Sequence, residues 1–134
     1  MRTVTIAVQA LVRVAGLIQV TLGVLFWTGR ATQLIGVHML VGIVLVLALW
    51  TMAALAARAG TPPALWLLAL GWGLLTVALG LTQTRLLPGS AHWLIQVLHL
   101  LVGLGTIGQA EALARRIKAR IGVRPAQTST PRLG

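Results

Sequence analysis

The chain has 134 residues, of which 57% are hydrophobic and 9% are charged, and its mean hydropathy of +0.93 excludes a water-soluble globular domain. Its formal net charge is +10, but the charges flank the apolar stretches, a pattern that indicates membrane topology and argues against nucleic-acid binding. Cysteine is absent, which excludes disulfides, iron–sulfur ligation and thioether-linked haem.

Four apolar stretches can each supply the roughly 20 residues that span a hydrocarbon core about 30 Å thick. They cover residues 4–26, 34–55, 64–81 and 91–110. The sequence therefore predicts an all-α integral membrane four-helix bundle. Residues 1–111 form its transmembrane domain, and residues 112–134 form a basic cytoplasmic tail that is helical at first and disordered from Pro125.

The distribution of basic residues predicts the orientation in the membrane. Only Arg30 and Arg85 lie in the first and third loops, whereas eight basic residues precede the first span, lie in the middle loop or follow the last span: Arg2, Arg58, Arg115, Arg116, Lys118, Arg120, Arg124 and Arg132. The positive-inside rule then places both termini in the cytoplasm, in a prokaryotic cell membrane. The tail is also expected to attract anionic lipid headgroups.

The first stretch carries Gln9, Arg13, Gly16 and Gly23 along one helical face. Arg13 lies about three turns into the span, where an arginine facing lipid costs roughly 2.5 to 3.5 kcal/mol on insertion scales. Two interpretations are open. Arg13 either extends to the cytoplasmic surface, or faces inward and pairs with an anionic cofactor group or a neighbouring carbonyl.

The second and third stretches each offer one notable face. His38 lies within about two turns of the start of the second, and Gly42 follows it by one turn. The third carries small residues that let another helix or a flat ligand approach closely, namely Gly73, Thr76, Gly80 and Thr84.

The fourth stretch contains a polar stripe in an otherwise apolar helix. At about 100° per residue, five side chains share a narrow arc: His92, Gln96, His99, Gly103 and Thr106. Polar groups at membrane depth usually face a bundle interior and mark a site. Glu111, the single acidic residue, ends this span, and Arg115 is its predicted ion-pair partner at i+4.

Short similarities indicate an internal repeat of two helical hairpins. The first hairpin has QVTLG from Gln19 and HMLVG from His38, and the second has TVALG from Thr76 and HLLVG from His99. The second and fourth helices run in the same direction, so His38 and His99 approach one leaflet. Depth alone does not decide whether His99 or His92 pairs with His38, but the repeat favours His99.

Two imidazoles opposed in an apolar bundle suit the axial positions of a b-type haem, which needs no cysteine. Gly42 and Gly103 each lie one turn beyond a histidine, where a missing side chain leaves room for a porphyrin plane. The predicted haem site comprises His38 and His99 as metal ligands, with His92, Gly42, Gly103, Gly80, Gln96 and Arg13 around them. His92, nearer the surface, would bond a propionate, orient a quinol or take a proton.

Over about residues 10–110 the chain resembles half of a haem A synthase. Members of that family are built like two fused four-helix bundles, in each of which the second and fourth helices supply haem-ligating histidines. The matching positions here are Gln19, Gly23, His38, Gly80 and His99. Leu34 stands where the catalytic half of the family has a glutamate before the histidine. The resemblance therefore implies the haem-b-holding half, and small quinol-linked cytochromes b are similar in plan.

We expect a membrane haem protein that transfers electrons between haem and a quinol or redox partner protein. One alternative is a haem A synthase-like or quinol-oxidising enzyme, or a protein that handles haem. Another is a non-haem structural or assembly subunit of a larger complex or homo-oligomer, in which the histidines bond neighbouring helices. Ion-coupled transport is disfavoured because Glu111 lies at the membrane boundary.

Overall fold

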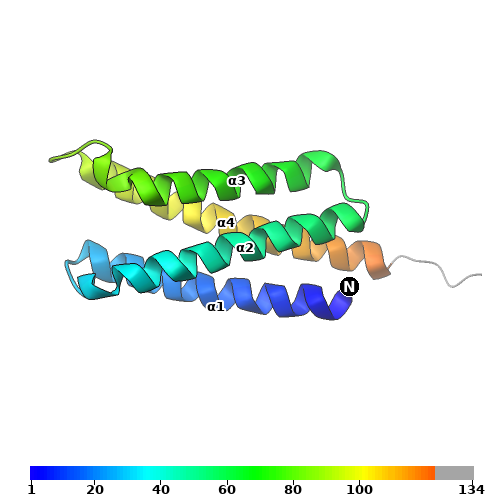
Figure 1. Cartoon of the computed structure of the whole chain (residues 1–134). Helices are drawn as coiled ribbons and strands as arrows, with labels where there is room; N and C mark the ends of the chain where they lie inside the picture. Colours follow the sequence, from blue (N-terminus) through cyan, green and yellow to red (C-terminus); the bar gives the residue numbers. More distant parts are fainter. Residues whose placement is uncertain (123–134) are drawn as a thin grey trace, which may run out of the picture.

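The computed structural model describes residues 1–122 and confirms the all-α four-helix bundle (Figure 1). Its long helices are α1 (Arg2–Trp27), α2 (Ile35–Arg58), α3 (Pro63–Thr82) and α4 (His92–Gly122), with short 3-10 helices η1 (Thr32–Leu34) before α2 and η2 (Gln83–Arg85) after α3. All four long helices are long and apolar enough to cross a membrane. The protein is therefore suited to a lipid bilayer.

The predicted spans start within two residues of these helices, and the largest difference is at the end of α4. That helix continues without a break to Gly122, so the first part of the predicted tail is an extension of the bundle. The disorder predicted from Pro125 lies outside the described residues.

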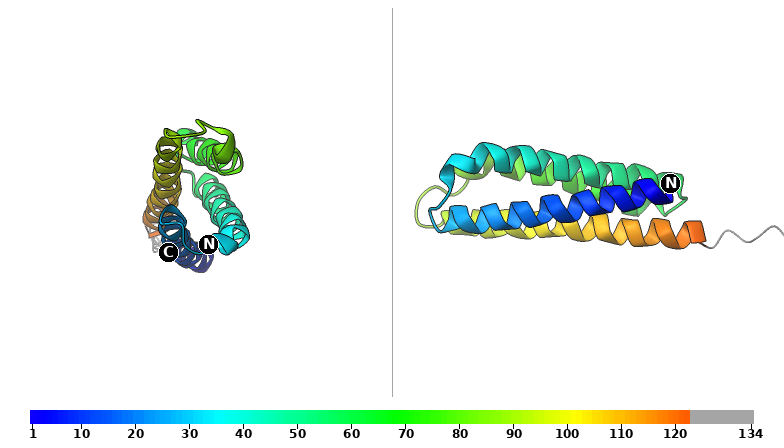
Figure 2. Two further views of the ribbon diagram at one scale, coloured as in Figure 1. Left: turned by 90° about the vertical axis from the view of Figure 1, so that its left-hand side faces the viewer. Right: turned by 90° about the horizontal axis from the view of Figure 1, so that it is seen from below.

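The long helices alternate in direction, so the start of α1 and the end of α4 lie at the same end of the bundle (Figure 1). We call this the terminal end, and the opposite end, with the α1–α2 and α3–α4 loops, the histidine end. Every pair of long helices is in contact except α1 and α3. The parallel helices α2 and α4 thus form the centre, flanked by α1 and α3 (Figure 2).

The turn between α2 and α3 shows why the chain reverses at this point. Gly60 has a φ of +74°, a conformation that costs a side-chain-bearing residue energy. Its N–H donates to the carbonyl of Ala57, and the N–H of Thr61 donates to that of Ala56, which is the Schellman pattern of a helix C-terminus. Pro63 then opens α3 at the first helical position, where its missing N–H is no loss.

The half of the bundle near the terminal end has an extensive, tightly packed core. Leu49, Met52 and Ile117 are fully buried there. Small residues around these three let the helix backbones approach one another closely. The whole buried cluster consists of Val12, Ala15, Leu45, Ala48, Leu49, Met52, Ala53, Leu55, Ala56, Ala69, Ala110, Leu113, Ala114 and Ile117. Side-chain packing across all four helices therefore holds this half together.

The half near the histidine end has a much smaller buried core. Its cluster contains Leu79, Ile95 and Val102, with the partly buried Trp72 packed against it. The indole nitrogen of Trp72 donates to the carbonyl of Val102 at 2.9 Å, and the ring lies against Gly105, where a Cβ atom would clash. This half thus joins α3 to α4 well but leaves its centre without a large apolar core.

Candidate functional site

The site is built around His38 and His99, which extend toward each other from the two central helices. His38 belongs to the first turn of α2, and His99 to the second turn of α4. Their ring centroids are 6.2 Å apart, with an angle of 57° between the ring planes. The parallel direction of α2 and α4 brings them to the same level, as the repeat predicted.

Helix α1 supports His38 through two contacts. Phe26 packs edge-on against the imidazole, with centroids 5.3 Å apart, and the side-chain amide of Gln19 donates a hydrogen bond to the carbonyl oxygen of His38. Gly42 makes this second contact sterically feasible, because a Cβ atom there would lie 3.1 Å from the Gln19 amide nitrogen. The space beside Gly42 is therefore occupied by Gln19, where the sequence had predicted room for a flat ligand.

His99 is supported by a different arrangement on α3. A Cβ atom at Gly80 would lie 3.3 Å from Cε1 of His99, so the glycine makes room for the imidazole ring itself. Gly103, one turn further along α4, has nothing within 4 Å of the position that a Cβ atom would occupy, although the residue is half-buried. Of the two glycines expected to give space to a flat ligand, Gly103 is the one beside open space.

Both imidazoles have a buried Nδ1 atom without a hydrogen-bond partner among residues 1–122. Most buried polar side-chain atoms in proteins are paired, so two unpaired nitrogens on facing rings call for a physical explanation. An imidazole nitrogen without a proton is also a metal ligand. The geometry therefore provides two buried imidazole nitrogens, one from α2 and one from α4, as candidate metal ligands.

The donor set suits a metal that brings other ligands with it. Within residues 1–122 there is no group of three or more His, Cys, Asp or Glu side chains placed to hold a metal ion. This is unfavourable for a bare zinc ion, which generally takes four ligands, or three and a water. It is compatible with haem, whose porphyrin supplies four nitrogens and leaves two axial positions for the protein.

His92 and Gln96 lie on the same helix but nearer the histidine end. His92 is the first residue of α4, and its Nδ1 atom is 3.2 Å from the carbonyl oxygen of Leu86 in the preceding loop. Gln96 is half-buried one turn further on. The ring that faces His38 is that of His99, so the structure settles the choice between the two histidines of α4 as its neighbour.

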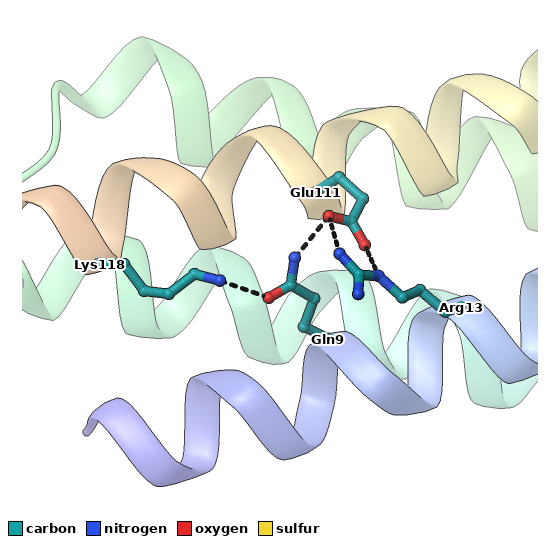
Figure 3. Close-up of polar contacts among 4 residues, drawn as sticks. All are labelled: Gln9, Arg13, Glu111 and Lys118. Carbon is teal, nitrogen blue, oxygen red and sulfur yellow. Dashed lines mark hydrogen bonds and ion pairs between the residues drawn. The ribbon is translucent and has the colours of Figure 1, made fainter.

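Arg13 is not part of this histidine group. Its Nε atom donates to Oε1 of Glu111 at 2.7 Å, and one terminal nitrogen donates to Oε2 at 3.1 Å (Figure 3). The amide of Gln9 also donates to Glu111, and its oxygen accepts a hydrogen bond of 2.7 Å from Lys118. These contacts join α1 to α4 in the half near the terminal end.

This network bears on two predictions, the ion-pair partner of Glu111 and the position of the Arg13 side chain. The ion-pair partner of Glu111 is Arg13, on another helix, and not the predicted Arg115 on its own helix. Arg13 satisfies neither interpretation fully, because its side chain is 65% exposed and yet paired with a protein carboxylate. The direct contact of Arg13 with the carboxylate of Glu111 is therefore favoured over a contact with Arg115, although Arg115 has the i+4 spacing on the same helix.

Sequence reasoning missed three contributors to the site region. These are Phe26 and Trp72, which are not distinct from other apolar residues in the sequence, and Gln19, which is distinct only as part of the repeat. A single phenylalanine close to a histidine-bearing turn is a weak signal. The contacts of Gln19 and Trp72 with backbone carbonyls depend on helix rotation, which residue spacing does not give.

Comparison of the chain with models of protein families, with curated proteins and with solved structures gave no significant match. The chemistry of the site residues is therefore the basis for the function proposed below.

Proposed function

We propose that this chain is a membrane-embedded b-type haem protein in which His38 and His99 are the two axial ligands. The observation that carries the proposal is the pair of facing imidazoles from parallel central helices, each with a buried nitrogen that has no partner. A metal ion bonded to one nitrogen of each of two imidazoles, at about 2.0 Å per bond, holds the ring centroids about 6 Å apart. The observed separation of 6.2 Å agrees with that requirement.

The sparse core around the histidines supports the same proposal. In the described part of the chain, its buried apolar cluster is limited to Leu79, Ile95 and Val102, whereas the other half of the bundle is filled by its own side chains. A large flat apolar cofactor is stabilised by burial against such surroundings. Gly103 supplies open space one turn from His99, and Gly80 leaves room for the ring of His99.

Electron transfer is the role that these residues favour. Haem supplies one-electron chemistry whose potential depends on its axial ligands, hydrogen bonds and burial. Ligation by both His38 and His99 leaves no coordination position for a substrate, which disfavours catalysis at the metal. The chain itself would hold the two ligands near one membrane surface, within reach of a quinol or a redox partner protein.

The positive charges add an orientation to this proposal. Arg2 and Arg58 lie at the terminal end together with the basic extension of α4, so that end faces the cytoplasm and the histidines lie near the opposite leaflet. The likeness to the haem-b-holding half of a haem A synthase belongs to the same proposal and rests on Gln19, Gly80 and the two histidines. Leu34 in place of a glutamate argues against oxidation of a haem methyl group.

Haem content of purified variants tests the proposal. The full chain is expressed with a haem supply, and haem is measured per protein for His38→Ala, His99→Ala and the control Thr82→Ala, whose hydroxyl bonds a carbonyl of its own helix. We expect both ligand variants to lose bound haem and the control to retain it. Unchanged haem content in both ligand variants would refute the proposal. If an alanine variant does not fold, His99→Met retains an axial donor and is expected to keep haem with an altered spectrum.

A further inference from the structure

The groove between α1 and α4 at the terminal end has a cation on its outer surface. Figure 3 shows the Arg13 guanidinium bonded to Glu111 through two of its nitrogens, while the third points away from the carboxylate. The Arg13 side chain is 65% exposed and that of Glu111 only 18%. The ion pair is therefore arranged with its carboxylate inside the groove and unused N–H donors of the arginine outside.

Positive charge exceeds negative charge in this groove. Lys118 donates to the neutral amide oxygen of Gln9, and Arg115, one turn beyond Glu111, acts on the carboxylate only through its electrostatic field. Glu111 is the single acidic residue of the whole sequence, so it can balance only one of these three cations. We call Arg13, Arg115 and Lys118, with Glu111 between them, the basic groove.

The depth of the basic groove places it where lipid headgroups lie. At 1.5 Å per residue, Glu111 is about 28 Å along α4 from His92, the first residue of that helix. The hydrocarbon core is about 30 Å thick, so a bundle with its histidine end near one surface brings Glu111 near the opposite one. Long basic side chains near the end of a span extend toward the phosphate groups of phospholipids, and basic pockets between helices there bind anionic headgroups.

We propose that the basic groove binds the phosphate of one anionic phospholipid. The free nitrogen of Arg13 and the ammonium and guanidinium groups of Lys118 and Arg115 are the donors, and the acyl chains lie along the exposed leucines and valines of α1. Arginine is well suited to this role because its planar fork matches phosphate oxygens. The site is independent of the haem proposal, since it uses none of the same residues.

Native mass spectrometry of the full chain tests this site. The protein is titrated in detergent with phosphatidylglycerol and, separately, with phosphatidylcholine carrying the same acyl chains. The variant Arg115→Gln/Lys118→Gln is compared with Arg30→Gln/Arg85→Gln, which removes two exposed cations from the histidine end and so has the same net charge. We expect the wild type to retain one phosphatidylglycerol in preference to phosphatidylcholine.

The groove variant should bind phosphatidylglycerol about 30-fold more weakly, and the control variant as tightly as the wild type. Equal retention of the two lipids, or equal loss in both variants, would overturn the proposal. Millimolar inorganic phosphate is added in a second series. Displacement of the lipid by phosphate would show a site for free phosphate instead, whereas retention supports the lipid. If the double variant does not fold, Arg115→Gln alone, at an exposed position, replaces it.

Discussion

The two halves of this bundle are stabilised by different means, although the same four helices form both. Near the terminal end, alanines on every helix bring the backbones together around Leu49, Met52 and Ile117. Near the histidine end, the buried apolar cluster is small, and the central position is taken by two imidazoles with unpaired nitrogens. This difference is what we expect if one half is a self-sufficient scaffold and the other half is completed by the haem that we propose.

Truncating one leucine in each half should give the largest difference in the free energy of unfolding. Leu49→Ala removes a fully buried side chain and should cost about 2 to 3 kcal/mol, the lower part of the range for soluble cores, because lipid-like surroundings already solvate apolar groups. Leu79→Ala in the small cluster should cost about 1 kcal/mol or less. Unfolding of the haem-free protein in mixed detergents measures both. Equal losses would remove the distinction between the halves.

A bulky residue at Gly103 should act on haem and not on the fold. Gly103→Leu fills the open space beside His99, so we expect at least tenfold weaker haem binding, equivalent to about 1.4 kcal/mol. Stability of the haem-free protein should be unchanged or higher, since glycine is a poor helix former. The matched control is Gly108→Leu, at an exposed position of the same helix. Haem titrations that give equal affinities for both variants would contradict the proposal that haem occupies the space beside Gly103.

The hydrogen bond from Gln19 to the backbone of His38 should have a smaller effect. Gln19→Ala removes an interhelical contact worth about 0.6 to 2 kcal/mol in membrane proteins, and it loosens α1 against the turn that carries His38. We expect modest loss of stability and faster haem dissociation. Thr82→Ala serves as the control, because that hydroxyl bonds only a carbonyl of its own helix. Identical haem dissociation rates in Gln19→Ala and wild type would show that Gln19 does not position the ligand.

The ion pair in the packed half should give the smallest change. Glu111→Gln leaves Arg13 without its anionic partner, and we expect the melting temperature to fall by a few degrees. The double variant Arg13→Gln/Glu111→Gln should recover most of that loss, because no unpaired charge remains. Haem content should stay unchanged in both. Loss of haem in either variant would contradict the separation of the basic groove from the histidine site.

Much of the fold could be predicted because apolar length and helical periodicity are local properties. The four spans followed from composition, and the facing of His38 and His99 followed from the repeat together with the alternation of helix direction. The pairing of Arg13 with Glu111 could not be obtained in this way. It joins residues 98 positions apart, and it depends on how α1 rotates against α4.

The same limit applies to the space that was expected beside Gly42. Spacing placed it correctly on the face of His38, one turn away, but it could not show that the side chain of Gln19 from α1 fills the adjacent space. Gly80 was correctly expected to permit close approach, and the group that approaches is the ring of His99. Helical periodicity assigns a face to a residue, whereas the neighbour on that face depends on tertiary packing.

The most direct test of the central claim is an optical spectrum of the purified wild-type protein, oxidised and then reduced with dithionite. Two axial imidazoles predict a low-spin haem with a Soret band that shifts on reduction and with sharp, separate α and β bands. Protein that is well folded, yet colourless and unable to take up added haem, would contradict the account and leave His38 and His99 as contacts between helices.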